Sequence, residues 1–106
     1  MRSDNWLKLG HKHGEHIKVS AKADYEIWTD RNNHIVGVTV NFEEAGDYHY
    51  DLLIEDWMKF LSKVLKNSNL EYTQKLFEKF LCEHNNMFDF EDALDLYDIK
   101  YDKIVF

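Results

Sequence analysis

The sequence contains no proline, four glycines and one cysteine among its 106 residues. Without proline, turns and helix caps must be made by Gly, Asn, Asp and Ser, and no proline-marked linker divides the chain. A single cysteine excludes an internal disulfide and is typical of a reducing compartment. No apolar run approaches the length of a membrane span, and residues 1–5 lead into no apolar signal segment, so we expect a cytoplasmic protein.

Catalytic and cofactor signatures are missing as well. The sequence has no Gly-rich phosphate loop, no nucleophile elbow, no helix with paired metal ligands and no spaced carboxylate pair in apolar surroundings. We therefore predict that the protein is not an enzyme and that it needs neither a cofactor nor a metal.

Two local features invite a chemical interpretation. His11, His13 and His16 lie close together, but no helix places two of them one turn apart, so a histidine-rich surface turn is favoured over a metal site. Cys82 lies at the edge of an apolar helical stripe and has no neighbouring His or Asp at a suitable spacing. This predicts a buried, inert thiol rather than a nucleophile.

The length of the chain allows one hydrophobic core and is too short for two, so residues 1–106 should form a single domain. Apolar residues make up 44% of the sequence and aromatic residues 15%. The aromatic share is high, and it predicts a core of large rings with some rings left over for a partner surface.

The strongest pattern runs from Ile17 to Phe42. Every odd position from 17 to 27 is apolar and the even positions between them are polar, which gives a strand one apolar and one polar face. After the turn residues 29–33 the alternation resumes on even numbers, beginning at Val36. The pattern predicts a long antiparallel hairpin whose apolar face needs a cover.

Weaker alternations flank this hairpin. Residues 6–9 predict a short first strand, and residues 48–52 form either part of a loop or a third strand. Residues 99–106 have the alternation of a last strand, which lies either inside the sheet or at its edge.

A helical period replaces the two-residue period in residues 53–66 and again in residues 69–84. Ser68 and Glu71 form a capping box at the start of the second helix, and the loop between the helices is short, so the two should pack antiparallel. Asp89 can cap a brief third helix. The predicted fold class is α+β: an antiparallel sheet built on the long hairpin, covered on one face by an antiparallel helical hairpin, with a C-terminal strand.

Charge is distributed unevenly along the chain. Residues 1–42 carry five acids and six bases, whereas residues 43–106 carry fifteen acids and seven bases. Within the second part, residues 43–56 hold six acids and no base, and residues 83–102 hold seven acids and one lysine. These acidic segments disfavour a nucleic-acid ligand, because its phosphates would meet carboxylates, and they favour a basic protein partner.

In both acidic segments the carboxylates alternate with large rings. Carboxylates steer a basic partner toward a surface, and aromatic rings anchor it there. We interpret the pattern as that of a small acidic inhibitor, an immunity protein that neutralises a cognate bacterial nuclease toxin by occluding its basic active-site cleft. The predicted partner-binding residues are Glu43, Glu44, Asp47, Tyr48, Tyr50, Asp51, Asp89, Glu91, Asp92, Asp95 and Asp98.

Two other classes fit the same composition. One is a nucleic-acid-mimicking inhibitor of a DNA- or RNA-binding phage-defence protein, and the other is a homodimeric regulatory or accessory domain without catalytic activity. A net charge of −7 serves solubility by itself, and the rings are equally consistent with core positions. The inhibitor interpretation requires the two acidic segments to form one exposed surface.

Overall fold

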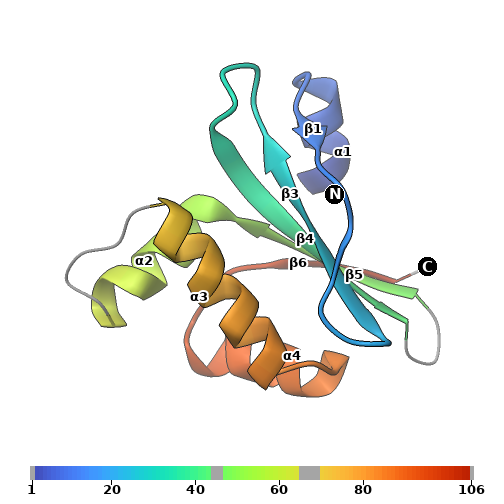
Figure 1. Cartoon of the computed structure of the whole chain (residues 1–106), viewed down its shortest axis with the longest axis vertical. Helices are drawn as coiled ribbons and strands as arrows, with labels where there is room; N and C mark the ends of the chain where they lie inside the picture. Colours follow the sequence, from blue (N-terminus) through green and yellow to red (C-terminus); the bar gives the residue numbers. More distant parts are fainter. Residues whose placement is uncertain (1, 44–46, 65–69, 106) are drawn as a thin grey trace.

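The computed structural model describes residues 2–43, 47–64 and 70–105 and has an α+β fold (Figure 1). The described part contains a six-stranded antiparallel sheet and four helices. In chain order the elements are α1 (Arg2–Lys8), β1 (Lys12–His13), β2 (Ile17–Lys18), β3 (Ala23–Thr29), β4 (Ile35–Glu43), β5 (Asp47–Leu53), α2 (Ile54–Val64), α3 (Leu70–Glu83), α4 (Met87–Leu96) and β6 (Asp102–Val105).

The hairpin of β3 and β4 is the centre of the sheet, as the alternation predicts. The strand order is β1-β3-β4-β5-β6, and β2 pairs with β3 beside β1. The connecting turn is held by Asp30, whose Oδ1 accepts hydrogen bonds from the backbone N–H groups of Asn32 at 2.8 Å and His34 at 2.9 Å. Asn33 adopts a φ of 62°, a left-handed conformation that asparagine tolerates better than most residues.

The first strand of the hairpin is shorter than expected. Residues 17–22 do not continue β3; instead β2 folds back on β3, with Ile17 opposite Tyr25 and Lys18 opposite Asp24. The reversal is closed by the backbone N–H groups of Val19 and Ser20, which both donate to the carbonyl oxygen of Ala23. The apolar alternation crosses this turn without a break, which is why the pattern conceals it.

The expected strand at residues 6–9 is also wrong, because residues 2–8 form helix α1. Trp6 is buried against the Trp28 ring, with 5.3 Å between the ring centroids, whereas Leu7 and Leu9 are exposed. Three apolar residues within four positions fit a strand and a helix equally well. The packing of Trp6 on the sheet decides between strand and helix.

The main core lies between one face of the sheet and the three helices α2, α3 and α4, which lie together on that side in Figure 1. Trp57 of α2 packs on Phe77 and Phe80 of α3, each at 5.3 Å between ring centroids. Phe90 of α4 packs on Phe42 of β4 at 5.4 Å. The cover therefore includes α4 as well as α2 and α3, and the antiparallel helical hairpin itself stays a prediction because its loop and Ser68 lie outside the described residues.

Three smaller expectations are resolved in the C-terminal part. Helix α4 is capped by Asn86, not by Asp89: the Asn86 Oδ1 accepts a hydrogen bond from the Asp89 backbone N–H at 2.9 Å. In the described part of the chain, strand β6 pairs with β5 alone and ends the strand order, so the last strand lies at an edge of the sheet. Cys82 is exposed, which corrects the expectation of a buried thiol.

Among the helices 2–8, 54–64, 70–83 and 87–96, none has the length and hydropathy that crossing a membrane requires.

Candidate functional site

Helix α4 presents the clearest exposed surface among the predicted partner-binding residues. Phe88 and Leu96 are large apolar residues that are 71% and 77% exposed. Spacings of four, seven and eight positions from Phe88 place Asp92, Asp95 and Leu96 on the same side of an α-helix. Asp89, Asp92 and Asp95 are all exposed. We call these five residues, Phe88, Asp89, Asp92, Asp95 and Leu96, the α4 face.

The opposite side of α4 fixes this face in place. Met87, Phe90, Ala93 and Leu94 are buried in the core. The helix is also held at its end, because the Tyr101 hydroxyl donates a hydrogen bond to Asp95 Oδ1 at 3.0 Å. The α4 face is therefore carried by a helix whose position is set by the core.

Glu91 lies at the border between the α4 face and the core. It accepts a hydrogen bond from the Tyr50 hydroxyl at 2.7 Å and pairs with the Lys103 ammonium at 2.8 Å, both through Oε2. The hydrogen bond from Lys103 is the largest of the effects that hold the pKa of Glu91 below its usual value, and the hydrogen bond from Tyr50 comes next. Burial and the neighbouring Glu91 carboxylate raise the pKa of Tyr50. Glu91 is thus engaged within the protein and is less available to a partner.

The described residues of the first acidic segment do not supply the exposed surface shared with α4 that the inhibitor interpretation requires, so the α4 face alone is left to carry that interpretation. Tyr50 and Asp51 are both 0% exposed, and they point to opposite faces of the sheet, so neither side chain offers a surface to a partner in this conformation and their role in binding stays a prediction. Glu43 is exposed at the end of β4, and Tyr48 is half-buried. Asp47 contributes backbone to β5. Glu44 and the side chain of Asp47 lie outside the described residues.

Asp98 is exposed beyond the end of α4 and has a φ of 56°. Its backbone N–H donates to the Asp95 carbonyl oxygen at 3.2 Å, which continues the turn that ends the helix. Asp98 therefore extends the negative charge of α4 by one turn beyond the α4 face.

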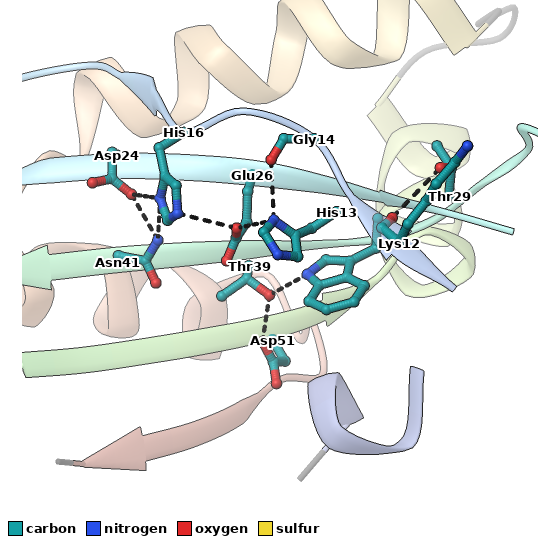
Figure 2. Close-up of polar contacts among 11 residues, drawn as sticks. Lys12, His13, Gly14, His16, Asp24, Glu26, Thr29, Thr39, Asn41 and Asp51 are labelled. Atoms are coloured by element: carbon teal, nitrogen blue, oxygen red, sulfur yellow. Dashed lines mark hydrogen bonds and ion pairs between the residues drawn. The ribbon is translucent and has the colours of Figure 1, made fainter. Parts of the chain in front are cut away.

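A second polar cluster, which the sequence patterns do not indicate, lies on the sheet face opposite to α2, α3 and α4 (Figure 2). We call this the back face. The strand register places Glu26, Thr39 and Asp51 in one row across β3, β4 and β5, and the register places Asp24 and Asn41 in the next row. Glu26, Thr39, Asn41 and Asp51 are all buried, although they are polar or charged.

A hydrogen-bonded chain crosses the back face. The Trp28 indole Nε1 donates to the Thr39 hydroxyl at 2.9 Å, and that hydroxyl donates to Asp51 Oδ1 at 2.6 Å. Buried polar groups are tolerated when they are paired in this way. Thr39 therefore joins a buried ring to a buried carboxylate, and its role is structural.

Two histidines from the segment before β3 bind the carboxylates of the back face (Figure 2). His13 Nδ1 lies 2.9 Å from Glu26 Oε2. His16 has a carboxylate at each ring nitrogen: Nδ1 is 3.2 Å from Asp24 Oδ1, and Nε2 is 3.4 Å from Glu26 Oε2. The Asn41 Nδ2 also donates to Asp24 Oδ1, at 2.6 Å.

These pairs attach the segment before β3 to the sheet. Among the described residues, no group of three or more His, Cys, Asp and Glu side chains is arranged to hold a metal ion. The sequence signal for the cluster was weak. The even positions of β3 are Asp24, Glu26 and Trp28, and only the tryptophan among them suggests that this face is covered.

Comparison with family models, with curated proteins and with solved structures yields no match for this chain.

Proposed function

We propose that the protein is an acidic inhibitor that binds a basic protein through the α4 face, and specifically an immunity protein that occludes the phosphate-binding cleft of a cognate bacterial nuclease toxin. It acts by binding and has no catalytic activity of its own. The observation that carries the proposal is the combination, on one helix, of exposed carboxylates with two exposed large apolar side chains, Phe88 and Leu96.

The apolar members of the α4 face supply the reason to expect a protein partner. Most surface apolar residues are scattered singly, whereas here Phe88 and Leu96 lie two helical turns apart on one side of one helix. Buried aromatic and aliphatic anchors contribute most of the affinity of typical protein interfaces. A helix used only to keep the domain soluble would not need them.

The carboxylates supply the expected charge of the partner. Asp89, Asp92 and Asp95 lie between and beside the apolar anchors, and the whole chain has a net charge of −7. Opposite charge on a partner accelerates association and selects against acidic surfaces. A nuclease cleft is a concave surface with positive charge, because it must bind phosphates. Such a cleft is complementary in shape and charge to a convex acidic helix.

The test uses co-expression with the toxin. We expect a neighbouring gene in the source genome to encode a protein with a basic C-terminal domain, which arrests growth when expressed alone and is harmless when this chain is co-expressed. The double variant Phe88→Ala/Asp92→Asn removes one anchor and one charge from exposed positions, and it should lose protection while the core is unaffected.

The matched control is Leu7→Ala/Glu15→Gln, which removes one exposed apolar side chain and one exposed carboxylate far from α4 in the sequence. This variant should protect as well as the wild type. Equal protection by both variants would contradict the role of the α4 face. If instead the chain gave no protection and displaced DNA from a DNA-binding protein, the nucleic-acid mimic would replace the immunity protein as the explanation.

A further inference from the structure

The segment from Lys12 to Lys18 lies along the back face and contains β1 and β2. We call it the strap. All seven of its residues are exposed, so the burial of apolar side chains does not hold it in place. Its attachments are short backbone ladders to β3, a hydrogen bond from the Gly14 N–H to the Ile27 carbonyl oxygen at 2.9 Å, and the contacts of His13 and His16. Segments with few buried contacts open most easily.

The strap covers groups that are otherwise costly to bury. Glu26 is 8% exposed and Trp28 is 3% exposed. His13 contacts both, with 2.9 Å to Glu26 Oε2 and 5.0 Å between its ring centroid and that of Trp28. A buried carboxylate is tolerated only while donors or positive charge compensate it. Within the described residues, the ion-pair partners of Glu26 are His13 and His16.

The geometry of His16 makes this compensation depend on a proton. A neutral imidazole has one N–H donor and one acceptor nitrogen, whereas the protonated ring has two donors. His16 has a carboxylate oxygen near each nitrogen, Asp24 at Nδ1 and Glu26 at Nε2. The neutral ring must therefore turn a lone pair toward one of the two carboxylates, although its Nδ1 also lies 3.4 Å from the Asn41 amide nitrogen, which can donate to that lone pair. Only the imidazolium satisfies both.

We propose that His16 is a proton-operated clasp: its protonation fastens the strap to the back face, and its deprotonation loosens the strap and uncovers Glu26 and Trp28. The clasp is separate from the α4 face and does not depend on the proposed function. The hydrogen bond to Asp24 is the largest effect on His16, and with the nearby Glu26 it raises the pKa of this histidine in spite of partial burial.

Other charged groups lie around the clasp. On the strap itself these are Glu15, which is exposed, and Lys18, which is opposite Asp24 in the strand register, together with Lys12 and His13. On the back face, the neighbours of Asn41 and Thr39 on β5 are His49 and Asp51. None of these contacts a ring nitrogen of His16 in the way that Asp24 and Glu26 do. Because His13 also contacts Glu26, a variant of His16 alone is needed to isolate the contribution of His16.

The direction of the pH effect follows from the raised pKa. A histidine whose pKa is higher in the folded state contributes stability that is complete below its ordinary pKa and is lost as pH rises through the folded value. The strap should therefore be closed in mildly acidic solution and should open as the pH rises. This is the opposite of a histidine that is buried in its neutral form.

The test is amide hydrogen exchange on the full chain from about pH 5 to about pH 8, the range in which histidine changes charge. The reporter is the Gly14 N–H, and the reference is the Ile99 N–H, which donates to the Leu94 carbonyl oxygen at 2.9 Å away from the strap. After correction for intrinsic exchange, the protection of Gly14 relative to Ile99 should fall several-fold as the pH rises. Unchanged relative protection would overturn the proposal.

Two variants separate the clasp from other titrations. His16→Gln keeps a polar side chain but cannot gain charge, so the relative protection of Gly14 should be lower than in the wild type at acidic pH and should change much less with pH. The control is His34→Gln, because His34 is exposed and its Nδ1 lies 3.8 Å from Asp30 in the hairpin turn; it should keep the wild-type profile. An NMR titration adds a second readout, in which Asp24→Asn should lower the pKa of His16. A wild-type profile in His16→Gln, or no effect of Asp24→Asn, would contradict the clasp.

Discussion

The Tyr50 hydroxyl donates a hydrogen bond to Glu91 Oε2 at 2.7 Å, and this contact joins the two acidic segments of the chain across the core. The segments meet, but they meet at a buried tyrosine and a carboxylate that also pairs with Lys103. The contact positions α4 on the sheet. It leaves the outer side of that helix as the exposed acidic surface.

The contribution of Glu91 should be visible in how the free energy of unfolding changes at acidic pH. Its pKa is lowered in the folded state, so its contribution to stability is complete above the ordinary glutamate value and is lost as the pH falls through the folded value. Glu91→Gln should therefore be less stable than the wild type at neutral pH, and the difference should shrink in acid. Urea unfolding at several pH values measures both. A difference that stays constant with pH would contradict the pairing with Lys103 and Tyr50.

Thr39 should be sensitive to loss of its hydroxyl. Thr39→Val keeps the branched shape but leaves the buried Asp51 oxygen and the Trp28 N–H without this partner, and we expect a loss of about 1–3 kcal/mol in the free energy of unfolding. Thr39→Ser keeps the hydroxyl and should lose much less. Denaturant unfolding measures both variants, and equal losses would show that the hydroxyl is unimportant.

Gly37 should tolerate no side chain. A Cβ at this position would lie 2.5 Å from the Leu52 carbonyl oxygen and 2.5 Å from the Trp6 ring. Gly37→Ala should cost at least about 1–3 kcal/mol, because β5 and α1 must both move. At Gly14 the nearest atom to such a Cβ is the Ile27 carbonyl oxygen at 3.8 Å, an ordinary contact. Gly14→Ala is therefore the matched control, and thermal unfolding should separate the two variants clearly.

The fold was predictable where a regular period reached a buried face. The alternation that resumes at Val36 and the helical periods of residues 53–66 and 69–84 predicted β4, α2 and α3 where the structure describes them. The reversal at residues 19–22 was missed because Val19 and Ala23 keep the apolar alternation through the turn. The strand predicted at residues 6–9 was wrong because so short a segment carries too few positions to separate the two-residue period from the helical one.

The candidate site was predictable only in part, because an antiparallel sheet is usually covered on one face and solvated on the other. That default makes Asp51 an exposed residue, whereas α1 and the strap cover part of the second face and Asp51 is buried. The same default leaves open whether Tyr50 is buried or exposed. The exposed acids of α4 follow from the sequence because Met87, Phe90, Ala93 and Leu94 define the buried side of that helix.

The most direct test of the central claim is the dissociation constant of the complex between this chain and the basic toxin domain, measured by calorimetry over a series of salt concentrations. We predict that affinity falls as salt rises, and that Phe88→Ala/Asp92→Asn weakens binding at least about tenfold at every salt concentration. The control Leu7→Ala/Glu15→Gln should bind like the wild type. Binding that is insensitive to salt, or equal for the two variants, would contradict docking through the α4 face.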